Sequence, residues 1–96
     1  MMRVFNEGNK KMVFNTEGLR YEIKKYSRTK KITLAQTRER LSEAIFVSAE
    51  TINGWYKGKN GPADLTTVKG LSRALELADD TLLLTTIDGE ILRWNI

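Results

Sequence analysis

Residues 41–62 read LSEAIFVSAETINGWYKGKNGP, and this stretch decides the fold. Ser48 is a favourable N-cap residue, and the spacing of Ile52 and Trp55 after it puts both side chains on one face of a helix. Gly58 ends that helix, because glycine readily takes the left-handed backbone conformation that closes a helix. The stretch therefore predicts a short helix with a buried inner face.

A second predicted helix lies directly before this one. It begins at Thr33, which forms a capping-box pattern with Gln36, and it runs through Phe46; Thr37 is an alternative N-cap. Only Phe46 and Val47 separate the two helices. A connection that short makes the helices cross sharply instead of lying antiparallel, which is the geometry of a helix-turn-helix.

Three further helices are predicted on either side of this pair. Leu19, Ile23 and Tyr26 form an apolar stripe at helical spacing after Thr16, which is the expected N-cap of the first helix. The first of the two helices after the central pair has an apolar stripe, and the second begins with acidic residues suited to a helix start. The three additional helices are expected over residues 16–30, 64–77 and 79–84.

The two ends of the chain differ from its helical middle. Short apolar segments flank glycine-containing turns there, which predicts a β-hairpin in residues 1–15 and a strand or tail in residues 85–96. A chain of 96 residues is too short for two folded domains, so residues 1–96 are expected to be one domain with a core at 18–84. The predicted fold class is mainly α, with five helices and short β-strands at the N- and C-termini.

The composition excludes several classes of function. The chain contains neither cysteine nor histidine, which removes disulfides, the commonest general base and the commonest transition-metal ligand. We therefore expect no enzyme activity, no metal site and no cofactor. The sequence also lacks a long apolar run, so no membrane segment or secretion signal is expected, and the absence of cysteine fits a cytoplasmic protein.

The charge is distributed unevenly along the chain. The net charge is +4 at pH 7, but residues 20–40 alone carry eight lysines and arginines against two glutamates. Residues 74–96 carry five acidic residues against one arginine. This asymmetry indicates one face that attracts a polyanion such as nucleic acid. A lysine-rich helix with a solvated outer face is the alternative interpretation of the same pattern.

The stretch quoted first, together with Val68 and Leu71 after it, closely resembles the lambda-repressor/Cro-like (XRE-type) helix-turn-helix DNA-binding domain family. The resemblance covers roughly residues 18–84. It implies a transcriptional regulator, repressor-like, that binds double-stranded DNA sequence-specifically as a homodimer with helix 48–57 in the major groove. Phe46 departs from the family, which often has glycine at this position because the backbone there takes a positive φ.

The resemblance also implies which residues contact DNA. Positions just after the N-cap of the third helix face the base edges, and the start of the second helix and the loop after the third face phosphates. The base-contacting positions are Ala49, Glu50, Asn53 and Gly54. The phosphate-contacting positions are Gln36, Thr37, Arg38, Lys57, Lys59 and Asn60.

The chemistry of the base-facing residues is limited. Asn53 can pair with adenine, Glu50 can accept from the cytosine amino group, and Ala49 can touch a thymine methyl. Glu50 is equally suited to stabilising the N-terminus of its own helix. Gly54 costs the helix about 1 kcal/mol relative to alanine, which indicates either a close approach of another group to its backbone or weak base readout.

These few base readers keep a second hypothesis open. The same fold can act as a protein-interaction module, for example an antitoxin-like or accessory protein whose strand-like tail engages a protein partner. The two functions do not exclude each other. A stable protein partner in the absence of DNA binding at low salt would distinguish the second hypothesis from the first.

Overall fold

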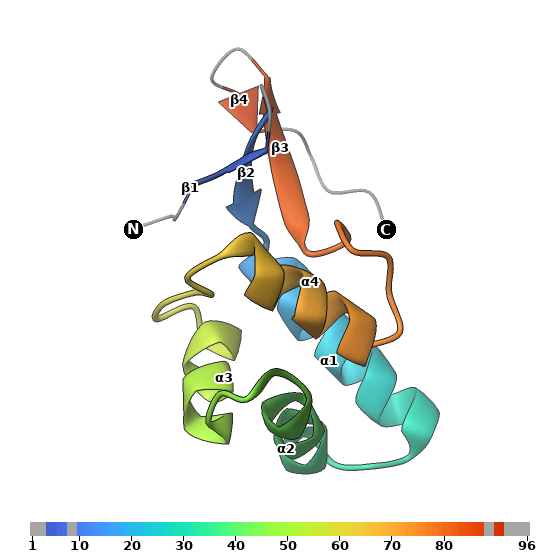
Figure 1. The fold of residues 1–96 in the computed structure, drawn as a ribbon. Helices are drawn as coiled ribbons and strands as arrows, with labels where there is room; N and C mark the ends of the chain where they lie inside the picture. The colour runs from blue at the N-terminus through green and yellow to red at the C-terminus, as the bar shows by residue number, and fades with distance from the viewer. Residues whose placement is uncertain (1–3, 8–9, 88–89, 92–96) are drawn as a thin grey trace.

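The computed structural model describes residues 4–7, 10–87 and 90–91, and it consists of a helical body with a small antiparallel sheet at one end (Figure 1). The described residues contain four helices, not the five predicted. The helices are α1 (Thr16–Lys30), α2 (Leu34–Ile45), α3 (Ala49–Tyr56) and α4 (Leu65–Ala74). The strands are β1 (Val4–Glu7), β2 (Lys10–Phe14), β3 (Leu83–Ile87) and β4 (Glu90–Ile91).

Local capping signals fix the central helices. Thr33 and Gln36 form the predicted capping box of α2, with reciprocal bonds of 2.9 and 3.0 Å. Ser48 is the N-cap of α3 and accepts a 3.0 Å hydrogen bond from the backbone of Thr51. Asn15, not Thr16, caps α1, because its side chain accepts from the backbone of Gly18 at 2.9 Å.

The predicted fifth helix over residues 79–84 is wrong. The chain forms turns before Leu83 and then enters β3, which pairs antiparallel with β2 so that Phe14 lies opposite Leu83. The backbone N–H of Asn15 also donates to the carbonyl of Leu82 at 2.9 Å. Pairing with a distant strand satisfies the backbone of this segment and buries Leu82 and Leu83, and this overrides its local helix signals.

The sheet joins the two ends of the chain. Its strand order is β1-β2-β3-β4, with each neighbouring pair antiparallel. β1 and β2 form the predicted N-terminal hairpin, in which Val4 pairs with Val13. The predicted C-terminal strand begins two residues earlier than expected, at Leu83, and residues 88–89 and 92–96 of that prediction lie outside the described part of the chain.

A single apolar core holds the helices together. Leu19 and Ile23 of α1, Leu41 of α2 and Ile52 of α3 are at most 1% exposed, and they belong to the same cluster of side chains. Trp55 is 5% exposed, so the prediction that Ile52 and Trp55 form the inner face of α3 is confirmed. Burial of each such side chain contributes about 1.5–3 kcal/mol, so α3 is firmly attached by its inner face. Within the described residues, we find no helix with the length and apolarity that crossing a membrane requires.

Candidate nucleic-acid interface

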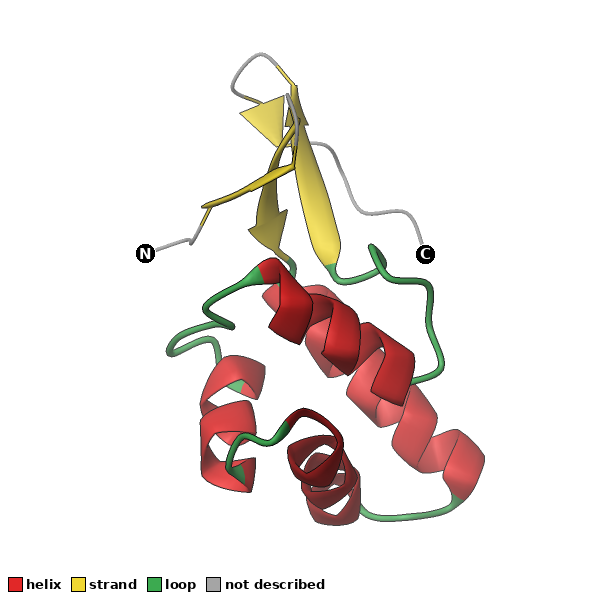
Figure 2. Ribbon diagram, in the orientation of Figure 1, coloured by secondary structure: helices red, strands yellow, loops and turns green. Residues whose placement is uncertain are grey.

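α3 lies on the outside of the helical body, beside α2 and away from the sheet (Figure 2). Its inner residues, Ile52 and Trp55, pack into the core. A helix buried on one face has its opposite face directed outward, and on α3 that face carries Glu50, whereas Asn53 stands at its edge and Ala49 lies one turn before the buried Ile52. Glu50 is exposed, whereas Ala49 and Asn53 are half-buried. Of these three predicted base-contacting residues, the structure turns Glu50 fully outward and leaves Ala49 and Asn53 only partly accessible.

The turn between α2 and α3 has the positive φ that the resemblance implied. Phe46 takes φ 59° and ψ 39°, and its backbone N–H donates to the carbonyl of Ser42 at 2.9 Å. The hydroxyl of Ser42 also donates to the carbonyl of Val47, which ties the turn to the end of α2. The ring of Phe46 is 93% exposed. This turn sets the angle at which α3 leaves α2, although a bulky residue stands where glycine is less strained.

Gly54, the fourth predicted base-contacting residue, is covered by the loop that follows α3. A Cβ placed on Gly54 would lie 3.1 Å from the side-chain oxygen of Asn60. The backbone N–H of Lys59 donates to the carbonyl of Gly54 at 3.0 Å, which holds the loop against the end of the helix. Glycine at this position is therefore explained by the close approach of Asn60. Asn60, which belongs to the loop after α3, is itself exposed.

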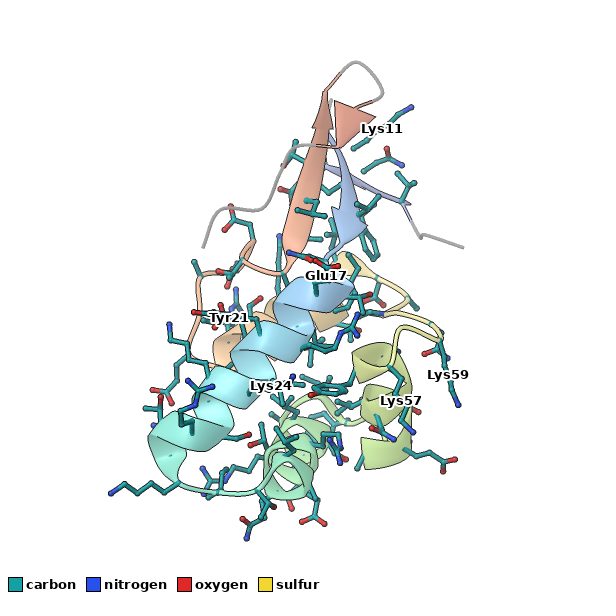
Figure 3. All side chains as sticks on the ribbon, turned by 180° about the vertical axis from the view of Figure 1, so that it is seen from behind. Lys11, Glu17, Tyr21, Lys24, Lys57 and Lys59 are labelled. Carbon is teal, nitrogen blue, oxygen red and sulfur yellow. The ribbon has the colours of Figure 1, made fainter. Side chains whose placement is uncertain are left out.

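Three of the predicted phosphate-contacting cations lie around the C-terminal end of α3. Lys57 and Lys59 are exposed, and both extend from the end of α3 and the following loop (Figure 3). Arg38 of α2 places its guanidinium 5.9 Å from the centre of the ring of Tyr56, the last residue of α3. The cation–π contact holds Arg38 beside the same end of the helix. The structure thus brings these three positive charges together on two adjacent elements.

Gln36 stands at the N-terminus of α2, where the first backbone amides have no carbonyl of their own helix to bond. Its side-chain oxygen accepts from the backbone of Thr33, so its amide nitrogen remains a donor at an exposed position. The positive end of the α2 dipole and this donor make the start of α2 suitable for a phosphate.

Thr37 does not belong to the phosphate-contacting set, and its prediction as such is wrong. Its side chain is fully buried, and its hydroxyl lies 2.6 Å from that of Ser27 and 3.2 Å from the carbonyl of Thr33. Nor is Thr37 the alternative N-cap of α2, since it lies inside the helix. It links α2 to α1 instead. Its position one helical turn before the buried Leu41 is the sequence signal that places it on the inner face.

The ion pairs between described residues lie away from the outward face of α3. Three ion pairs are found among the described residues. Lys30 pairs with Glu76 at 2.8 Å, Lys69 with Glu7 at 3.0 Å, and Arg73 with Asp79 at 2.8 Å. All three involve α4, the residues after it, or the end of α1. None of these pairs uses Lys57, Lys59 or Arg38. The cations beside α3 are therefore left with their charge available.

Sequence reasoning did not place Lys24 in the interface. Figure 3 shows Lys24 on α1, on the same face of the molecule as Lys57 and Lys59. Lys24 is exposed and belongs to the basic segment 20–40. The positive charge of that segment is the sequence signal for Lys24. The packing of α1 against α3 is what brings Lys24 near the candidate interface.

Two carboxylates away from this surface titrate at lower pH than usual. Two hydrogen bonds from Arg73 hold the pKa of Asp79 below its ordinary value of 3.8. The backbone N–H of Thr67 lowers the pKa of Asp64, the N-cap of α4. Both effects stabilise the helical body and involve no group of the candidate interface.

The interface described above is a helix presented by its outward face, with cations at its C-terminal end and a helix N-terminus nearby. Among the described side chains, no group of three or more aspartates and glutamates is placed to hold a metal ion. The chain as a whole matches no protein-family model, no curated protein and no solved structure.

Proposed function

We propose that this protein binds double-stranded DNA sequence-specifically and acts as a repressor-like transcriptional regulator, with α3 in the major groove. One observation carries the proposal. The outward face of α3 is free of the core, and the cations beside it make none of the described ion pairs. The resemblance of residues 18–84 to the lambda-repressor/Cro-like (XRE-type) family supports the same function.

The chemistry of α3 assigns a role to each residue. The amide of Asn53 donates to and accepts from adenine, the carboxylate of Glu50 accepts from the amino group of cytosine, and the methyl of Ala49 contacts thymine. Lys57 and Lys59 neutralise phosphates on one side of the groove. With four to six phosphates neutralised, the logarithm of the affinity falls with the logarithm of salt concentration at a slope of about −4 to −5.

The proposal includes a homodimer on a site with two-fold symmetry. Two copies of α3 then enter successive major grooves on one side of the duplex, about 34–36 Å apart or a multiple of that distance. A single copy offers only two side chains that hydrogen-bond to bases from the outward face of α3. Doubling the contacts through a palindromic site compensates for this small number.

The proposal is tested by selecting bound sequences from a random pool of duplex DNA, with light scattering on the same sample. We expect enrichment of a palindrome and the mass of a dimer. The Asn53→Ala variant, selected in parallel, loses the preference at one base pair of each half-site and keeps the rest of the motif. A pool that stays random after selection with the parent protein contradicts sequence-specific binding.

One observation favours a second candidate function, a protein-interaction module of the antitoxin-like or accessory type. The ring of Phe46 is 93% exposed in the turn next to α3, and exposed aromatic side chains are enriched where proteins bind one another. This function predicts a stable complex with a protein partner, and the Phe46→Ser substitution should weaken that complex. The absence of any DNA shift at low salt, together with such a complex, would favour it over DNA binding.

A further inference from the structure

A groove of about 180 Å³ runs between α1 and the residues that follow α4. Its apolar lining comes from Tyr26, from Leu75, which is 4% exposed, and from the half-buried Leu77. Glu22 also lines it. The groove therefore combines an aromatic ring and two leucines with charged side chains, since Lys25, Lys30 and Glu76 line it besides Glu22, and an apolar wall with a few polar groups is typical of a small-molecule site.

Glu22 is the only acidic side chain that is buried among the described residues, at 6% exposed. Its carboxylate takes part in none of the ion pairs or side-chain hydrogen bonds found between described residues. Burial of a charge is unfavourable unless the charge is paired. The carboxylate oxygens of Glu22 are not among the enclosed polar atoms without a partner, so they are open to solvent and available to a cation.

The two lysines that line the groove do not supply that cation. Lys30 places its ammonium 2.8 Å from Glu76 and 5.6 Å from the centre of the ring of Tyr26. Lys25 directs its ammonium to the ring of Tyr21, at 6.0 Å from the centre. Each ammonium is engaged with a group other than Glu22. A cation that enters the groove from outside the described chain therefore meets a carboxylate that neither lysine occupies.

We propose that this groove binds a small organic amine, whose ammonium group pairs with Glu22 and whose apolar body packs against Tyr26, Leu75 and Leu77. The volume sets the size of the ligand. A cavity of about 150 Å³ holds one benzene molecule, so this groove accommodates one six-membered ring with a short aminoalkyl group. A carboxylate beside an aromatic ring selects a cation over a neutral or anionic molecule of the same shape.

The site is separate from the candidate nucleic-acid interface. The C-terminal half of α1 and the end of α4, which border the groove, lie on the far side of the helical body from α3 (Figure 1). An amine in the groove leaves the outward face of α3 uncovered. The proposal therefore stands or falls independently of DNA binding, and it is tested without DNA.

The test titrates the ¹⁵N-labelled protein with benzylamine at neutral pH, where the amine is protonated, and with benzyl alcohol, which has the same shape without the charge. We expect benzylamine to shift the amide signals of residues 22–30 and 75–77 in a saturable way. Benzyl alcohol should bind at least about tenfold more weakly, because it carries no positive charge to pair with the carboxylate of Glu22. Equal affinities, or no saturable shift with benzylamine up to its solubility limit, overturn the proposal.

Two variants locate the charge that matters. Glu22→Gln keeps the shape of the side chain and lowers the affinity for benzylamine about tenfold. It removes a buried charge without a partner, so the variant keeps the fold and the amide spectrum of the parent. Glu43→Gln makes the same change at an exposed position of α2 and leaves the affinity unchanged. Undiminished binding to Glu22→Gln refutes the proposed site.

Discussion

The side-chain oxygen of Asn60 lies 3.1 Å from the point that a Cβ on Gly54 would occupy. This contact holds the loop after α3 against the helix, and it explains why a residue that weakens helices stands in the last turn of the eight-residue α3. The loop carries Lys59, whose backbone N–H bonds to Gly54. The absence of a side chain at Gly54 therefore helps to place a cation that we assign to phosphate binding.

This contact predicts a coupling between the two residues. In an Asn60→Ala background, Gly54→Ala should raise the free energy of unfolding by about 1 kcal/mol, because alanine has the higher helix propensity. In the parent background the gain should be smaller, since the new methyl group displaces the side chain of Asn60. Urea unfolding of the four proteins in this double-mutant cycle measures the difference. Equal gains in both backgrounds would show that the contact has no energetic consequence.

The assignment of Lys57 and Lys59 predicts a change in salt dependence. Replacing either lysine by alanine should weaken binding to every duplex and make the slope of log affinity against log salt shallower by about 0.9, because one fewer phosphate is neutralised. Fluorescence anisotropy at several salt concentrations measures this slope. Lys69→Ala is the control, because Lys69 pairs with Glu7 at 3.0 Å beside the sheet and should leave the slope unchanged. Identical slopes for all the variants would argue against phosphate contacts at these lysines.

The left-handed backbone at Phe46 predicts a stabilising substitution. A side chain in this conformation costs about 1–2 kcal/mol, and glycine avoids most of that cost. Because the ring is 93% exposed, its removal forfeits little packing. Phe46→Gly should therefore raise the free energy of unfolding by about 1 kcal/mol and the melting temperature by about 4–8 °C. Phe46→Ala removes the same ring but keeps the strain, so it should give no comparable gain in a thermal melt.

The pair of Arg73 and Asp79 predicts a loss of stability in acid. Arg73 donates two hydrogen bonds to Asp79, at 2.9 and 2.8 Å, and these lower the pKa of Asp79 from its ordinary value of 3.8. A carboxyl group with a lower pKa in the folded state adds stability above 3.8, and this stability is lost as pH falls through the folded-state value. We expect the free energy of unfolding to decline from about pH 5 downward.

Substitution at Asp79 isolates this contribution. Asp79→Asn should flatten the decline in urea unfolding measured at a series of pH values, because asparagine does not titrate. Asp80→Asn is the matched control, since neither hydrogen bond from Arg73 reaches Asp80. The account of this pair would be wrong if both variants followed the same pH profile as the parent.

The parts of the fold that sequence reasoning predicted correctly are those that neighbouring residues decide. The capping box at Thr33 and the N-cap at Ser48 set the starts of α2 and α3, and Gly58, with φ 79°, closes the turn after α3. The inner face of α3 followed from the spacing of Ile52 and Trp55. Each of these signals acts over one or two helical turns, so the sequence shows it directly.

Apart from the N-cap of α1, which is Asn15 instead of the predicted Thr16, the errors occurred where distant residues decide. Residues 79–84 carry the acidic start of a helix, but pairing with β2 brings Leu83 opposite Phe14 and makes a strand instead. The roles of Thr37 and Gly54 depend on Ser27 and Asn60, which come from other elements. Side-chain contacts of this kind require the packed structure. For the same reason the groove at Glu22 was not predicted, because its two walls come from α1 and from the chain after α4.

The most direct test of the central claim is to map the binding surface with duplex DNA. A ¹⁵N-labelled sample is titrated at low salt with a duplex recovered by selection, or with a random-sequence duplex if selection enriches none. The account predicts the largest amide shifts in residues 49–60 and at the N-terminus of α2. Shifts concentrated in the sheet, or no shifts at any duplex concentration, would contradict the claim that α3 is the surface that binds DNA.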